Sequence, residues 1–167
     1  MADNAGTGGV AGFDPARIEE IINRGIPHCG ELGIHVERIG DGTCCLRLDY
    51  QERLVGDPAS GVLHGGVITT LTDSVSGMSV YMALKKFVPI ATLDLRIDYL
   101  RPSTPHEPLF AEAHCFKTTR QIAFVRGLAY NNDRDDPVAS CAGTFMINSS
   151  DTPPLSGRSK QGREAGQ

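Results

Sequence analysis

The sequence lacks an excess of positive charge, which excludes several classes of function. It contains 16 Lys and Arg against 20 Asp and Glu, so its formal net charge is −4 at pH 7. A chain with this balance has no basic field that attracts nucleic acid or an anionic membrane surface. Any anionic ligand must therefore be held by a few local cations.

Metal-binding and hydrolase motifs are missing as well. The five cysteines form no C-x-x-C pair, and no Cys and His stand at zinc spacing. We therefore expect reduced thiols in a cytoplasmic protein, with no metal site. The chain contains no G-x-x-x-x-G-K, G-x-S-x-G or H-E-x-x-H motif. No metal or redox cofactor is implied.

Targeting and membrane segments are not predicted either. Residues 1–12 have neither Lys nor Arg and no apolar run, so they form no signal peptide, and their Gly and Ala predict a flexible N-terminus. The longest weakly charged stretch, 65–84, carries six Ser and Thr hydroxyls and an Asp, so we expect no membrane span. The polar, Gly- and Pro-containing end predicts a disordered tail over 149–167.

The rest of the 167 residues fits one domain, over 13–148. Asp14 before Pro15, followed by isoleucines at helical spacing, predicts a helix that ends at Arg24. Turn residues predict a loop over 51–63. A long helix is predicted over 65–86, and strands over 33–38, 43–50, 91–100, 108–117, 122–131 and 138–148. Six strands and one main helix indicate an α+β protein with an antiparallel sheet.

Asp73 is the one charged residue among the twenty of 65–84. At about 100° per residue it falls roughly 200° from Leu71, which lies in the apolar stripe of the helix. The face around Asp73 carries small hydroxyl and aliphatic residues, whereas a solvent-facing helix surface usually carries Lys, Glu and Arg. We therefore expect the helix to be buried on both sides. A carboxylate there is costly unless it is partnered or used in chemistry.

The start of this helix is a second candidate feature, because His64-Gly65-Gly66 leads directly into it. The first amide groups of a helix lack internal partners, and glycines let a ligand approach the backbone closely. Such a start can bind an anion or a developing oxyanion. Asp73 lies roughly 12 Å further along the axis, too far for both groups of one chain to hold one reacting carbon. A site that uses both groups therefore predicts a symmetric dimer.

Two segments, matched in order and spacing, resemble a known family. The first is Gly61-Val62-Leu63-His64-Gly65-Gly66-Val67-Ile68-Thr69-Thr70-Leu71-Thr72-Asp73, which fits G-x-x-H-G-G with an acid nine residues after the His. The second is Thr92-Leu93-Asp94-Leu95-Arg96-Ile97-Asp98-Tyr99-Leu100-Arg101-Pro102. On these residues the chain resembles the PaaI-like hotdog-fold acyl-CoA thioesterases of the 4-hydroxybenzoyl-CoA thioesterase superfamily. The resemblance covers 21–148.

This resemblance implies a hotdog fold, in which a curved antiparallel sheet of about six strands wraps a long central helix. It also implies dimers with sites at the subunit interface, often paired into homotetramers. Asp73 would activate water or attack the thioester itself, and the Gly65 N–H would bind the thioester carbonyl. His64 would shape the loop at the helix start, and Gly66 would let the substrate approach.

The family further implies two positions outside the helix. Thr92 falls where some members place a Ser or Thr that orients the water, although regular alternation puts it on the strand face opposite Leu93. Asp57 stands in the loop before the motif, where many relatives carry an Asn. An ionised Asp57 can accept a hydrogen bond but cannot donate one.

The predicted function is hydrolysis of an acyl-CoA thioester, with coenzyme A present only as part of the substrate. Residues Val67, Ile68, Met78 and Met82 are expected to wall the acyl pocket. An acyl-thioester hydratase or dehydratase is an alternative, but no second acid lies near His64 in the sequence. A non-catalytic acyl-CoA-binding module is another. The candidate partners for the phosphates are Arg101, Lys117, Arg120 and Arg126.

Overall fold

The computed structural model describes residues 14–148. The predicted flexible N-terminus (1–12) and the predicted disordered tail (149–167) lie outside the described residues. Within 14–148, no helix is both long enough and apolar enough to cross a bilayer. The five cysteines all fall in this part of the chain and are free, buried thiols.

Two short helices begin the described chain. The predicted first helix is α1 (Pro15–Gly25), which buries Ile18 and Ile22. A second helix, α2 (Pro27–Leu32), follows directly and was not predicted. Pro27 was interpreted as a stop signal, but proline also fits the first position of a new helix, where its missing N–H is not needed. Gly33 ends α2 with a φ of 70°, a left-handed conformation that glycine adopts without strain.

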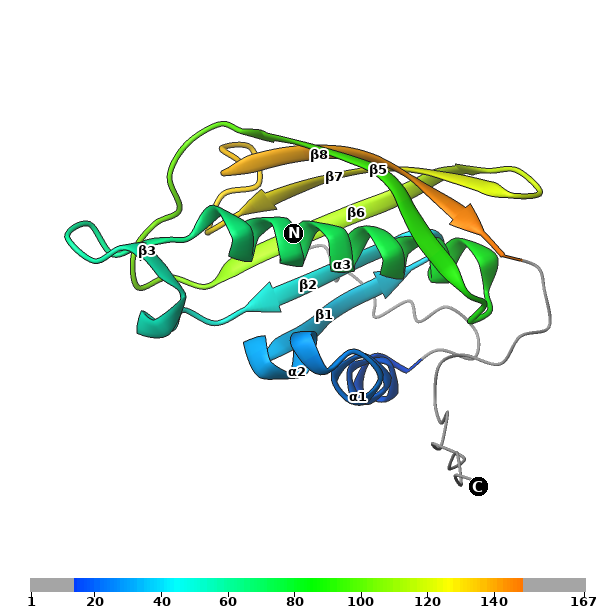
Figure 1. The fold of residues 1–167 in the computed structure, drawn as a ribbon, viewed down its shortest axis with the longest axis horizontal. Helices are drawn as coiled ribbons and strands as arrows, with labels where there is room; N and C mark the ends of the chain where they lie inside the picture. Colours follow the sequence, from blue (N-terminus) through cyan, green and yellow to red (C-terminus); the bar gives the residue numbers. More distant parts are fainter. Residues whose placement is uncertain (1–13, 149–167) are drawn as a thin grey trace, which may run out of the picture.

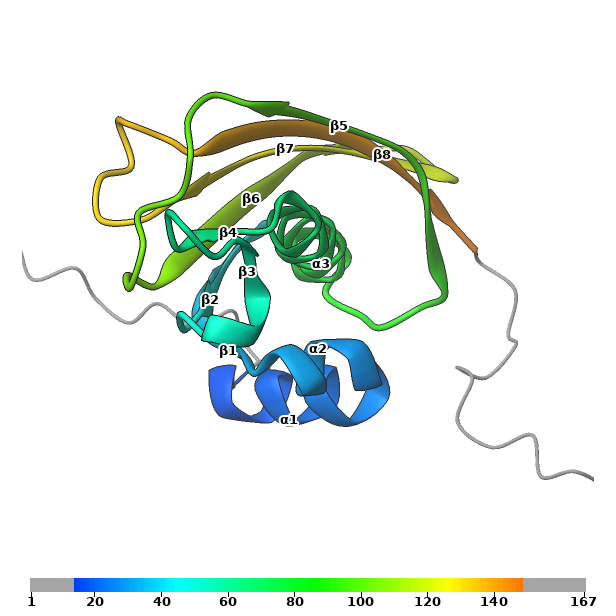
Figure 2. The same ribbon diagram turned by 60° about the vertical axis from the view of Figure 1, so that its left-hand side comes forward.

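The six predicted strands form one antiparallel sheet in the order β1-β2-β6-β7-β8-β5. Its strands are β1 (Ile34–Gly40), β2 (Thr43–Leu48), β5 (Ile90–Tyr99), β6 (Leu109–Thr118), β7 (Ile122–Tyr130) and β8 (Ala139–Ile147). The sheet curves around a single long helix, as Figures 1 and 2 show. This is the α+β architecture that the sequence predicts, with a curved antiparallel sheet around a long central helix.

The long helix α3 (Gly65–Leu84) lies on the concave face of the sheet. Its apolar stripe, which includes Leu71, Val75 and Met82, is buried in the main core. The helices α1 and α2 lie on the side of α3 that faces away from the sheet (Figure 2). The helix α3 ends at Leu84, two residues before the predicted end, because Lys85 takes a left-handed conformation with a φ of 53°.

The predicted loop 51–63 contains ordered elements that the sequence reading missed. A 3-10 turn, η1 (Glu52–Leu54), precedes a two-stranded hairpin of β3 (Val55–Asp57) and β4 (Val62–Leu63). Segments of two or three residues are too short to show a hydrophobic period, so only their turn residues were visible. This hairpin leads directly into α3 and therefore fixes the direction from which the chain enters the helix.

Candidate functional site

The first turn of α3 presents one unused backbone donor. His64 is the N-cap, and its Nδ1 accepts a hydrogen bond from the N–H of Gly66 at 3.0 Å. The N–H of Val67 donates to the His64 carbonyl at 2.9 Å. No acceptor for the N–H of Gly65 is found among residues 14–148. Gly65, and not Gly66, is therefore the residue of this turn whose amide is available to a ligand.

The hairpin before α3 holds this cap in place. The His64 N–H donates to the Leu54 carbonyl at 2.9 Å, and the Leu63 N–H donates to the buried Ser103 hydroxyl at 3.0 Å. Gly56 packs against His64, since a Cβ at that position would come within 2.8 Å of the His64 Cα. A side chain at residue 56 would thus displace the cap residue.

Asp73 lies on the side of α3 that faces β5, and Thr92 is its partner. The Thr92 hydroxyl donates to Asp73 Oδ1 at 2.9 Å. Regular alternation would have turned Thr92 away, but the β5–β8 register shifts between Thr92, which pairs with Phe145, and Asp94, which pairs with Thr144. Two residues of β5 thus oppose one of β8, as in a β-bulge. The bulge brings Thr92 to the face that carries Ile97 and Tyr99.

The surroundings of Asp73 are poor in charge. Asp73 is half-buried, and no Lys, Arg or His nitrogen of residues 14–148 lies within 4 Å of its carboxylate. Burial is the main reason for the raised pKa of the Cys29 thiol, and the Asp73 carboxylate raises it further. Burial is also the main reason for the raised pKa of the Cys141 thiol, and the Asp73 carboxylate again raises it further. Thiols and hydroxyls therefore surround a carboxylate that has no cationic partner in the described part of the chain.

The face of α3 around Asp73 is buried in the C-terminal half of the helix, where the lack of charged side chains predicts burial. Ser76 and Val80 are fully buried. Cys29 of α2 lies 3.5 Å from the Ser74 hydroxyl, and Cys141 of β8 lies 3.9 Å from the Ser76 hydroxyl. The prediction that the helix is buried on both sides therefore holds for its C-terminal half, while Thr69 on the same face is exposed and Asp73 is half-buried.

The structure groups some predicted site residues and separates others. His64, Gly65 and Gly66 form one unit, and Asp73 with Thr92 forms another. Eight residues of helix, roughly 12 Å, separate the two units within the chain.

Asp57 lies apart from both units, in the turn of the β3–β4 hairpin. Its carboxylate accepts from the Ala59 N–H and the Ser60 hydroxyl, and the Ser60 bond is the main reason why the pKa of Asp57 is lowered. It therefore shapes the turn and has no contact with the start of α3 among the interactions of the described chain.

The predicted phosphate partners lie apart from these units. Arg101 donates to the Asp136 carbonyl and forms an ion pair with the Asp136 carboxylate at 2.9 Å. Arg120 is exposed in the β6–β7 turn, next to Gln121, whose carbonyl accepts from Ile147 at the end of β8. Because Ile147 pairs with Ile90, this turn lies at the opposite end of β5 from Tyr99.

The expectation that the apolar stripe of α3 walls an acyl pocket stays a prediction. The four residues proposed as pocket walls are buried in the main core, against the sheet. They are Val67, Ile68, Met78 and Met82. In the described chain these side chains therefore pack in the core.

Tyr99 is a neighbour of the site that the sequence reading missed. Its hydroxyl donates to the Gly65 carbonyl at 3.0 Å and lies 2.8 Å from the Thr69 hydroxyl. Tyr99 was interpreted only as one of the alternating apolar residues of the strand. Its phenol group could have indicated this contact, because a tyrosine hydroxyl usually finds a hydrogen-bond partner when it is buried.

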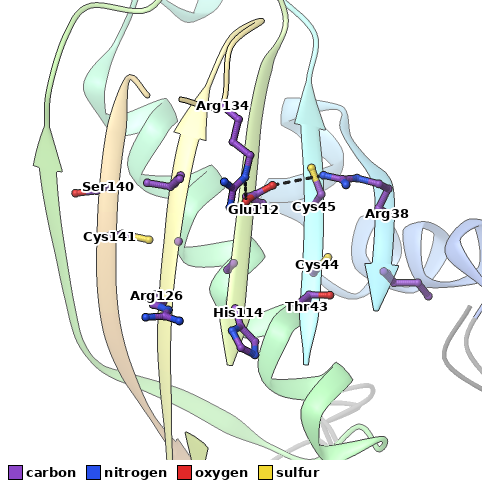
Figure 3. A pocket seen from close by; sticks show the side chains of 14 residues that line it. Arg38, Thr43, Cys44, Cys45, Glu112, His114, Arg126, Arg134, Ser140 and Cys141 are labelled. Atoms are coloured by element: carbon purple, nitrogen blue, oxygen red, sulfur yellow. Dashed lines mark hydrogen bonds and ion pairs between the residues drawn. The ribbon is translucent and has the colours of Figure 1, made fainter. Parts of the chain in front are cut away.

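A hollow of about 830 Å³ lies elsewhere in the described chain. In Figure 3, Arg38, Glu112 and Arg134, which line this hollow, lie on the face of the sheet that points away from α3. There Glu112 of β6 binds both Arg38 and Arg134. The sheet separates this hollow from Asp73 and Gly65, so the two candidate units do not open into it.

Comparisons with known proteins agree with the fold. The family model described as "Thioesterase superfamily" matches residues 60–138. An Escherichia coli protein, medium/long-chain acyl-CoA thioesterase YigI, is 29% identical over 135 residues, which are 73% of this chain and 86% of that protein. A Halobacterium salinarum protein, provisionally named an esterase, is 38% identical over 100 residues; the match spans 56% of this chain and 66% of that protein.

Solved structures extend the likeness to most of the chain. A crystal structure of a Pseudomonas aeruginosa protein has 40% sequence identity and a TM-score of 0.72, and covers 80% of this chain and 98% of its own. A mutant of the phenylacetic acid degradation protein PaaI from Thermus thermophilus has a TM-score of 0.64 at 24% identity, and covers 73% of this chain and 99% of its own. With its motif, its fold and these relatives, the chain belongs to the thioesterase superfamily, a family of thioester hydrolases with the hotdog fold.

Proposed function

We propose that this thioesterase hydrolyses acyl-CoA at two equivalent sites, each formed across a dimer interface. The Gly65 N–H of one chain binds the thioester carbonyl oxygen, and Asp73 of the other chain supplies the carboxylate. The observation that supports this most directly is the free N–H of Gly65 at the start of α3, where the helix dipole favours negative charge.

The edge strand β5 supports the proposed dimer. It has ten residues and is the last strand of the sheet, so one row of its backbone groups has no neighbour within the described chain. Leu93, Tyr99 and Leu100 are 53%, 52% and 56% exposed at this edge. A long, apolar, unpaired edge is a template for pairing with another strand. A second copy of β5 fits it by antiparallel pairing about a two-fold axis.

Such pairing would assemble the two separated units. Within one chain, Tyr99 contacts Gly65 near one end of β5, and Thr92 contacts Asp73 near the other end. Antiparallel pairing about the middle of β5 places one chain's Tyr99 end beside its partner's Thr92 end. The free amide of one chain then faces the carboxylate of the other. The same pairing carries Arg120, at the far end of the sheet, toward the partner's site, where it can bind a phosphate group of coenzyme A.

The proposed chemistry needs no group beyond these residues and water. In one route, Asp73 takes a proton from water, the resulting hydroxide attacks the carbonyl carbon, the C–S bond breaks, and the proton passes from Asp73 to the leaving thiolate. In the other, the Asp73 carboxylate attacks the carbonyl carbon, the C–S bond breaks and a mixed anhydride forms. Water then hydrolyses the anhydride, which restores the carboxylate, and a proton of that water ends on the thiolate. Both routes release the acid and the coenzyme A thiol, and both place negative charge on the oxygen that Gly65 binds. The Thr92 hydroxyl orients Asp73 in either route.

Asp73→Asn tests the assignment, because the amide keeps an oxygen that can accept from Thr92 but cannot act as base or nucleophile. Release of free thiol from a panel of aromatic, short, medium and long acyl-CoAs is measured. We expect turnover to fall by at least about 10²-fold with an unchanged melting temperature. Asp94→Asn, the same change on the outer face of β5, is the matched control. Activity of Asp73→Asn within a few-fold of wild type would refute the assignment.

The alternatives have less support in the geometry. A hydratase or dehydratase needs an available acid–base pair, but His64 Nδ1 is occupied by the Gly66 N–H, and no carboxylate is bonded to His64 within residues 14–148. Hydration of crotonyl-CoA without thiol release would favour that alternative. Binding of acyl-CoA with neither reaction would favour a non-catalytic binding module.

A further inference from the structure

The hydroxyl of Tyr99 holds the first peptide unit of α3. It donates to the Gly65 carbonyl at 3.0 Å, and the Thr69 hydroxyl donates to the same carbonyl at 3.1 Å. The two hydroxyl oxygens are 2.8 Å apart. Because each hydroxyl has one proton, a bond from one hydroxyl to the other replaces that hydroxyl's bond to the carbonyl. At the other end of this peptide unit, the Gly66 N–H donates to His64 Nδ1. Both polar groups of the Gly65–Gly66 peptide are therefore fixed by side chains.

This clamp matters because the turn consists of two glycines. Glycine has no Cβ and reaches more backbone conformations than other residues, so a Gly-Gly helix start does not hold its own amide groups in one direction. The Gly65 N–H is separated from the clamped peptide only by the two backbone dihedrals of Gly65. Fixing the Gly65 carbonyl therefore restricts the direction in which the free N–H points.

We propose that Tyr99 is a positioning residue of the thioesterase site, which aims the Gly65 N–H at the thioester carbonyl by holding the adjacent peptide. The inference rests on the proposed function of Gly65. It adds a role for β5: the strand that orients Asp73 through Thr92 also orients Gly65 through Tyr99. One strand thereby sets the direction of both reacting groups.

Tyr99→Phe is the direct test, because it deletes one hydroxyl and leaves the ring that packs beside Gly65. We expect kcat to fall about tenfold, which is less than the 10²- to 10³-fold loss for a missing oxyanion donor, because the N–H remains but is less well aimed. KM, the oligomeric state and the melting temperature should stay near wild type. Tyr130→Phe is the matched control, since it removes a hydroxyl bonded to Glu112 on the far face of the sheet.

Thr69 provides a second pair of variants. Thr69→Val removes the hydroxyl and keeps the shape, so it should lower kcat in the same way. Thr69→Ser keeps the hydroxyl, so its kcat should be close to that of wild type and above that of Thr69→Val. The double variant Tyr99→Phe with Thr69→Val should lose less than the product of the single losses, because both hydroxyls act on one carbonyl.

The inference is overturned if Tyr99→Phe retains wild-type kcat, or if it lowers kcat only in proportion to lost dimer or lost folded protein. NMR on glycine-labelled protein gives a readout that is independent of activity. In Tyr99→Phe the order parameter of the Gly65 N–H should fall and the Gly66 amide should exchange faster, while unchanged values would contradict the role of Tyr99. If wild type releases no thiol from any acyl-CoA, the proposed function fails, and this measurement still tests the clamp.

Discussion

Replacement of Gly65 by proline can separate the backbone amide of this residue from everything else that it contributes. Gly65 is the first residue of α3, where the helix does not use the N–H. Proline is favoured at this position and requires the preceding residue to be extended. His64 already is, with φ of −63° and ψ of 135°. A Cβ at Gly65 would lie 3.5 Å from the Tyr99 hydroxyl, which is an ordinary contact.

The structure therefore predicts a folded proline variant with a specific defect. Where its backbone conformation fits, proline stabilises a protein by about 0.4–1 kcal/mol through the unfolded state, so the melting temperature should not fall. Loss of one oxyanion donor should lower kcat by about 10²- to 10³-fold. Thiol release at saturating acyl-CoA measures kcat, and circular dichroism and sedimentation measure fold and assembly in the same preparation.

Gly65→Ala is the control that keeps the N–H. Its methyl group points toward Tyr99 and narrows the approach of the substrate, so it should mainly raise KM and change kcat far less than proline. Two results would refute the role of the amide. One is a folded, correctly assembled proline variant with near-normal kcat. The other is an alanine variant whose kcat is as low as that of proline, which would mean that Gly65 supplies only space.

Two further predictions concern the cap and the edge strand. His64→Ala should lower the free energy of unfolding by about 0.5–2 kcal/mol, because the Gly66 N–H loses its cap. His64→Asn should recover most of that loss, and chemical denaturation measures both variants. Equal stability of wild type and the two variants would contradict the role of His64 as a cap. Sedimentation at micromolar concentration should find a dimer or a dimer of dimers, and a fully active pure monomer would refute both the β5 pairing and the shared site.

The sequence predicted the larger elements because each repeats a period often enough to be seen. The stripe of α3 spans five turns, and the strands alternate over six to ten residues. The helix α2 and the β3–β4 hairpin were missed because six, three and two residues show no period. Pro27 also carries an ambiguous signal, since the residue that ends one helix can begin the next.

Contacts between side chains that lie far apart in the sequence were less predictable. The charge of Arg101 suggested a phosphate partner, yet its guanidinium binds Asp136, 35 residues away. Asp73 was found because a single carboxylate interrupts an uncharged helix. Its contact with Thr92 depends on a bulge, and the residues of β5 alternate so regularly that nothing in their order reveals the extra one. The hydroxyl of Tyr99 was overlooked because its ring fits the apolar face.

The two units of the proposed site lie apart within the described chain, as a site shared between two chains requires. The Gly65 unit is held by His64, Thr69 and Tyr99, and the Asp73 unit is held by Thr92, so each is ordered within its own chain. Neither contact requires the other unit, because α3 keeps them two turns apart. In the proposed dimer, the edge of β5 joins the units, and the side chains of Thr92 and Tyr99 on this strand contact both of them. Pairing of that edge would therefore create the site without any rearrangement inside a chain, and loss of pairing would remove activity while leaving each unit intact.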